Sequence, residues 1–118
     1  MAPPAPHWIA CLKAYGYCVI PEFVPASTIA ALDADLDPHF QAQPCSVGAF
    51  YGEHTKRFGG LLNRSAHAET LVRHPLVLEI CDAVLGPWCD RIALNLTQAI
   101  EIGPGAPPQF PHRPARPR

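Results

Sequence analysis

The sequence predicts an α+β domain in which N-terminal helices precede the first strands of a β-structure. Apolar residues make up 48 % of the 118 residues and charged residues 16 %, a composition that can fill a hydrophobic core. Helical and strand-like periodicities follow one another along the chain. Six of the fifteen prolines lie in the last fifteen residues, so the ordered pattern stops before the C-terminus.

Apolar residues at helical spacing predict four helices. Gly16 offers a stop for the first, and Ser27 or Thr28 caps the second, which Pro38 is expected to end or kink. Pro75 suits the first position of the fourth helix, which Gly86 and Pro87 stop. The expected helices cover residues 8–15, 26–40, 65–74 and 75–85.

Two segments are expected to form strands, residues 17–20 and residues 91–102. The second alternates with period two, so that its even positions, from Ile92 to Ile102, are mostly apolar. Its odd positions include Asn95 and Thr97, neutral groups that form hydrogen bonds. Such a face suits either solvent or the wall of a polar pocket, and the pattern does not choose between them.

Charge and cysteine usage favour a cytoplasmic protein without nucleic-acid or membrane partners. The formal net charge is −1, and no apolar run approaches the roughly 20 residues that cross a bilayer. The N-terminus lacks the features of a secretory signal. The five cysteines include no C-x-x-C pair, so we expect small buried hydrophobic residues rather than disulfides or a zinc site.

Two groups of possible metal ligands have simpler interpretations. Asp33, Asp35 and Asp37 alternate on an expected helix, where neighbours two apart diverge, so a solvated face is favoured. His67-Ala-Glu69 matches the H-x-[DE] pair of the 2-His-1-carboxylate iron triad, but a helix would separate those side chains by roughly 200°. Lys56 or Arg57 could reach an acidic group, although a surface salt bridge is the favoured role for either.

His112 is the one credible metal ligand, because it follows a strand, a Gly-Pro-Gly turn and Gln109. Two residues beyond it stands Pro114, which cannot bind iron. The stretch from Leu94 to Arg113 resembles the first metal-binding stretch of the phytanoyl-CoA dioxygenase-like family. Residues 16–24 and 74–87 are similar to the opening strand and the pre-core helix of that family.

The resemblance implies a double-stranded β-helix of the jelly-roll or cupin kind with helices on one side. Members use Fe(II), 2-oxoglutarate and O2 to hydroxylate a small-molecule substrate. His112 matches the first metal histidine, whereas Pro114 replaces the aspartate. By the same resemblance, Asn95 and Thr97 line the pocket and contact 2-oxoglutarate or substrate, and Gln109 braces the site.

The resemblance divides the chain into a disordered N-terminus (1–7), the N-terminal part of an oxygenase domain (8–113) and an aberrant proline- and arginine-rich tail (114–118). We expect the domain to be incomplete and the tail to come from a frameshift or misplaced stop. Translating the downstream DNA in all frames checks this. If no frame restores Asp after His-Arg, with a later His and Arg, the expectation is wrong.

Three outcomes follow from these residues. The first is a truncated member of the family that is inactive on its own and binds neither Fe(II) nor 2-oxoglutarate tightly. The second is a non-catalytic small-ligand-binding or interaction module that keeps the polar strand face. The third is an unstable chain without a role, because the strand of residues 91–102 would have open edges and an uncovered apolar face.

Overall fold

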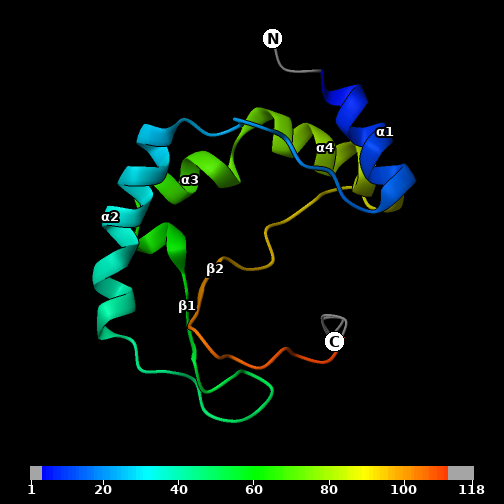
Figure 1. The fold of residues 1–118 in the computed structure, drawn as a ribbon. Coiled ribbons are helices and arrows are strands. Elements are labelled where there is room, and N and C mark those ends of the chain that lie inside the picture. The colour runs from blue at the N-terminus through cyan, green and yellow to red at the C-terminus, as the bar shows by residue number, and fades with distance from the viewer. Residues whose placement is uncertain (1–3, 112–118) are drawn as a thin grey trace.

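The computed structural model describes residues 4–111 as a mixed helical and β chain, which confirms the α+β class. The helices form an arch: α2 and α3 make one limb, and α4 and α1 lie across the top (Figure 1). A two-stranded antiparallel sheet lies beside the lower half of α2. The elements are α1 (Ala5–Tyr15), α2 (Ala26–Ala42), β1 (Thr55–Gly59), η1 (Leu61–Asn63), α3 (Ala66–Val72), α4 (Pro75–Leu85), η2 (Gly86–Trp88) and β2 (Gln98–Ile102).

The four expected helices are present, and local sequence explains their ends. Gly16 closes α1 in the left-handed conformation, at φ 80°, and its N–H donates to the carbonyl of Leu12. Ser65 caps α3, and Pro75 is the first residue of α4. The expectation that Pro38 ends or kinks its helix is wrong about the end, since α2 continues to Ala42. Proline removes one donor, and the turns on either side hold the helix.

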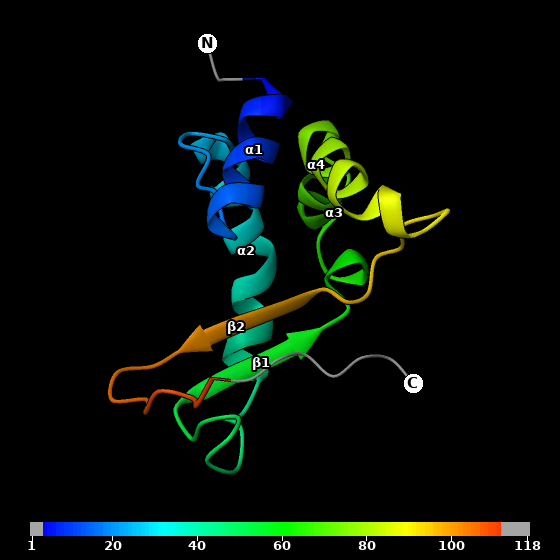
Figure 2. The same ribbon diagram turned by 90° about the vertical axis from the view of Figure 1, so that its right-hand side faces the viewer.

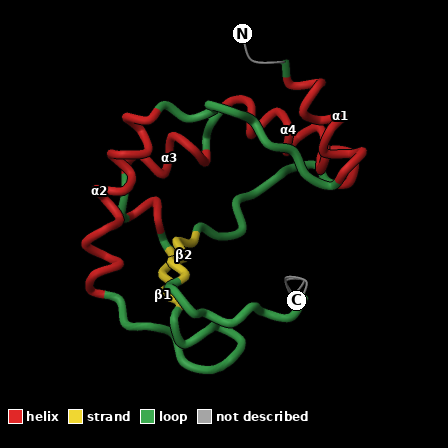
Figure 3. The backbone as a smooth tube through the Cα atoms, viewed as in Figure 1, coloured by secondary structure: helices red, strands yellow, loops and turns green. Residues whose placement is uncertain are grey.

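The strands are shorter than the sequence predicts (Figure 3). Residues 17–20 form no strand, and residues 91–97 run as a loop before β2 begins at Gln98. A strand needs a partner to satisfy its backbone, and β1 pairs only with residues 98–102. The sheet therefore has two strands, and a double-stranded β-helix is not seen among residues 4–111.

The core lies between α2 and one face of this sheet. Leu36, Phe58 and Ala99 are each at most 8 % exposed, and Leu32, Phe40 and Leu61 pack against them. The register places Phe58 opposite Ala99, so both side chains lie on one face of the sheet, where they pack with Leu36 of α2. Figure 2 shows α2 running alongside this sheet. None of the large side chains within the described residues is fully buried, so the core is thin.

Candidate functional site

The residues expected to bind ligand lie in two separate places. Asn95 and Thr97 line a depression beside β2, together with Gly59, Gly60 and Asn63. The Thr97 hydroxyl accepts a hydrogen bond from the backbone N–H of Leu61 at 2.9 Å, which ties the loop before β2 to η1. Asn95 is exposed. The structure therefore brings these two side chains to one concave surface, and their role in binding stays a prediction.

Gln109 does not join that depression. Its side-chain amide donates to the backbone carbonyl of Phe50, and the neighbouring Phe110 ring lies 5.6 Å from the Phe50 ring. These contacts fold the segment after β2 onto the loop before β1. His112, the expected metal ligand, lies outside the described residues.

A 2-His-1-carboxylate iron site needs three protein donors that converge on one point. Within residues 4–111, no three His, Cys, Asp or Glu side chains are grouped so that they could hold a metal ion. The described donor set therefore does not fit iron. His67 and Glu69 diverge as expected for a helix, since His67 contacts Asp35 whereas Glu69 pairs with Arg73 at 2.7 Å.

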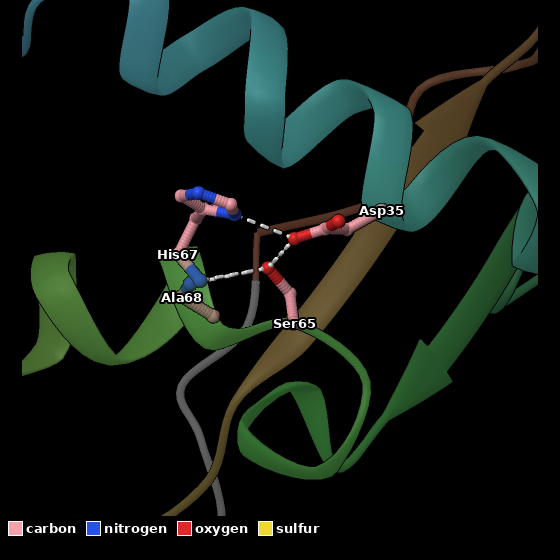
Figure 4. A network of polar contacts seen from close by, with 4 residues as sticks. All are labelled: Asp35, Ser65, His67 and Ala68. Carbon is pink, nitrogen blue, oxygen red and sulfur yellow. Dashed lines mark hydrogen bonds and ion pairs between the residues drawn. The ribbon is translucent and has the colours of Figure 1, made fainter.

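A polar network joins α2 to the start of α3 (Figure 4). Ser65 Oγ donates to Asp35 Oδ2 at 2.6 Å and accepts from the N–H groups of His67 and Ala68. The His67 ring nitrogen Nδ1 lies 2.7 Å from the same carboxylate oxygen. The hydrogen bonds from His67, and then from Ser65, hold the pKa of Asp35 below its ordinary value of 3.8.

This network has the residue types of a hydrolase triad but not the arrangement. In a triad the histidine stands between serine and aspartate and takes the serine proton. Here the aspartate stands between them, and Ser65 is only 4 % exposed. The network therefore caps and clamps helices. It also corrects the expectation that Asp35 belongs to a solvated face, because an N-cap serine thirty residues away reaches it.

The cations Lys56 and Arg57 point to opposite faces of the sheet. Lys56 Nζ donates to the carbonyl of Phe40 at 3.0 Å on the α2 side. Arg57 pairs in register with Ile100, on the face away from α2. Among the described residues neither forms the salt bridge that was favoured for them.

Arg57 is the least satisfied of these polar groups. Its Nη2 reaches the carbonyl of Tyr51 at 3.4 Å, and its guanidinium lies over the Tyr51 ring, 5.6 Å from the centroid. Its Nε is buried with no hydrogen-bond partner. Arg57 as a whole is half-buried on the sheet face away from α2, and a guanidinium in such a place is suited to a planar anion such as a carboxylate.

A further surface groove is mostly apolar. This groove, between α4 and residues 92–96, is lined by Val77, Cys81, Leu85 and Leu94 among others. None of the helices in the described part of the chain is long and apolar enough to cross a bilayer.

Comparison of the sequence with known proteins identifies a family. No curated protein matches the chain significantly. The family model for phytanoyl-CoA dioxygenase matches residues 12–115, which is most of the chain and includes the strand, turn and histidine on which the resemblance was based. The chain therefore belongs to the phytanoyl-CoA dioxygenase family.

Proposed function

We propose that this chain carries the N-terminal portion of an Fe(II)/2-oxoglutarate-dependent oxygenase domain and is catalytically inactive on its own. The family match over residues 12–115 supports the dioxygenase class. In such a domain iron and 2-oxoglutarate supply the oxidising chemistry for hydroxylating a small molecule. The double-stranded β-helix is part of the same proposal, with β1 and β2 as two of its strands.

The proposed inactivity rests on the metal-binding side chains that the chain offers. Residues 4–111 offer no convergent trio of metal-binding side chains, and residues 113–118 contain no His, Cys, Asp or Glu. The last seven residues of the sequence add a single metal-binding side chain, His112, and one imidazole does not make a facial triad.

Succinate formation from 2-oxoglutarate, with Fe(II), ascorbate and O2, tests this proposal. We expect no turnover above the protein-free background, and an intact family member assayed in parallel shows that the conditions support turnover. An anaerobic Fe(II) titration adds a second readout, in which wild type and His112→Ala bind iron equally weakly. Turnover or tight iron binding that His112→Ala abolishes would refute the inactive assignment.

A second candidate function, binding of a small carboxylate without iron, is favoured by Arg57. Its half-buried guanidinium and its place opposite Ile100 on the face away from α2 combine a cation with an apolar floor. A carboxylate would pair with this guanidinium. Asn95 and Thr97, which line the depression beside β2, remain separate candidates for contacting a small ligand.

Thermal unfolding with and without 2-oxoglutarate or succinate, in the presence of a chelator, tests this candidate. Ligand that binds the folded chain raises its melting temperature. We expect a rise for wild type and for Arg73→Gln, an exposed arginine on α3's C-terminal side, and none for Arg57→Gln. An equal rise in both variants, or none in wild type, contradicts a site at Arg57.

A further inference from the structure

The chain exposes more surface than a compact monomer of its size. Its accessible surface is 9315 Å², whereas a folded monomer of 12.8 kDa exposes about 6300 Å². The radius of gyration is 16.5 Å, against about 13.5 Å for a compact domain of this length. The excess of about 3000 Å² is larger than the roughly 800 Å² that each partner buries in a standard interface. Another polypeptide surface therefore has room to cover this one.

The segment from Arg91 to Glu101 is the part best suited to pairing. β2 has β1 on one side and no strand on the other, and residues 91–97 join no ladder within the described chain. Charged residues and proline normally prevent an edge strand from pairing with another strand. Between its two charged ends this segment contains neither, and it contains no glycine. Leu94 is 54 % exposed and Leu96 63 % exposed.

The sequence of this segment is nearly self-complementary when read antiparallel to itself. Centring the pairing on Leu96 sets Arg91 opposite Glu101 of a second copy, at both ends of the ribbon. Ile92 then faces Ile100. The other pairs are Ala93 with Ala99, Leu94 with Gln98, Asn95 with Thr97, and Leu96 with itself. Only Leu94 with Gln98 joins an apolar to a polar residue.

Register and charge together select this pairing. Opposite residues have the same parity, so the mostly apolar even face and the mostly polar odd face both continue across the two copies. Centring on Asn95 or Thr97 instead separates Arg91 from Glu101. Arg91 and Glu101 are both exposed, and neither forms an ion pair among the described residues.

We propose that the edge formed by residues 91–101 is a homodimerisation site, at which two copies pair antiparallel about a two-fold axis through Leu96. The result is a four-stranded sheet of order β1-β2-β2-β1, with an isologous interface. Two strands are marginal in water, and four satisfy more of the backbone. Pairing also orders residues 91–97 as strand. The proposal is independent of the proposed activity.

Sedimentation equilibrium of the full chain over a wide dilution series tests the dimer. We expect a monomer–dimer equilibrium whose dissociation constant rises at least a hundredfold in Leu96→Asp, because two carboxylates meet on the axis. Val47→Asp, at a 90 % exposed position in a loop before β1, is the matched control and keeps wild-type affinity. A monomer at every concentration, or a dimer indifferent to Leu96→Asp, overturns the proposal.

A charge exchange tests the register. Arg91→Glu and Glu101→Arg each place like charges opposite one another, and we expect each to weaken the dimer by roughly tenfold. The double variant restores opposite charges and recovers most of the affinity. Circular dichroism should show strand signal rising with dimer concentration. Failure of the double variant to recover, growth beyond the dimer into open assemblies, or a different polypeptide found in stoichiometric amount with the chain overturns the assignment.

Discussion

The two faces of the β1–β2 sheet differ sharply, although the same strands build both. On the α2 side, Phe58 and Ala99 are at most 8 % exposed and pack with Leu36. On the other side, Ile100 is 45 % and Ile102 70 % exposed. On β2 the larger side chains, Ile100 and Ile102, are thus on the open face, while the small Ala99 is buried. Burial here depends on which face a helix covers, and not on the hydrophobicity of the strand.

The largest expected loss of stability comes from removing a buried side chain on the face that α2 covers. Phe58→Ala removes a ring that packs against Phe40 at 4.7 Å and supports the Arg64 guanidinium at 5.2 Å. We expect a loss of about 3 kcal/mol in the free energy of unfolding, because the cavity lies in the centre of a thin core. Urea denaturation measures it. A loss below about 1 kcal/mol would mean that the α2 face contributes little more than the open one.

Removing the Ser65 hydroxyl should have the next largest effect. Ser65→Ala deletes the N-cap of α3 and the bond to Asp35, so about 1–2 kcal/mol of stability should be lost. Ser27→Ala is the control, since Ser27 is exposed in the first turn of α2 and gives no cap there. The interpretation fails if both variants unfold at the same urea concentration.

Acid should weaken the same clamp through Asp35. Because the hydrogen bonds from His67 and Ser65 lower the pKa of Asp35 in the folded state, the unfolded chain binds its proton first as the pH falls. The stabilisation is therefore present above the ordinary value of 3.8 and is lost as the pH drops through the lower folded value. Unfolding curves between neutral and strongly acidic pH should show this loss.

Asp35→Asn should flatten that acid dependence, since an amide does not titrate. Asp33→Asn, at an exposed position on the same helix, serves as the control and should retain the wild-type acid sensitivity. Identical acid profiles for Asp35→Asn and wild type would show that other groups cause the loss.

The smallest effect is expected on the open face. Ile102→Thr keeps a β-branched residue at a position that is already 70 % exposed, so the free energy of unfolding should change by less than about 0.5 kcal/mol. Position 102 also lies outside the proposed dimer register, so self-association should be unaffected. A destabilisation approaching that of Phe58→Ala would remove the distinction between the two faces.

Local sequence predicted the helices well because their signals act over a few residues. Gly16 and Pro75 occupy the stop and first-turn positions that were assigned to them, whereas the cap expected from Ser27 or Thr28 is wrong, because α2 has no side-chain cap. The candidate site was less predictable. Thr97 lies on a concave surface, and the partner of its hydroxyl, Leu61, comes from a segment 36 residues earlier, which spacing along the chain does not indicate.

The sequence alone determined the α+β class, the positions of the four helices, the period-two pattern of residues 91–102 and the family. Each of these is encoded in short-range spacing or in a contiguous motif. Only the tertiary structure decided that α2 covers the Ala99 face, that β2 begins at Gln98, and that Asp35 reaches Ser65 and His67. The reason is physical: a strand or carboxylate is stabilised by a partner distant in sequence, and spacing along the chain does not specify that partner.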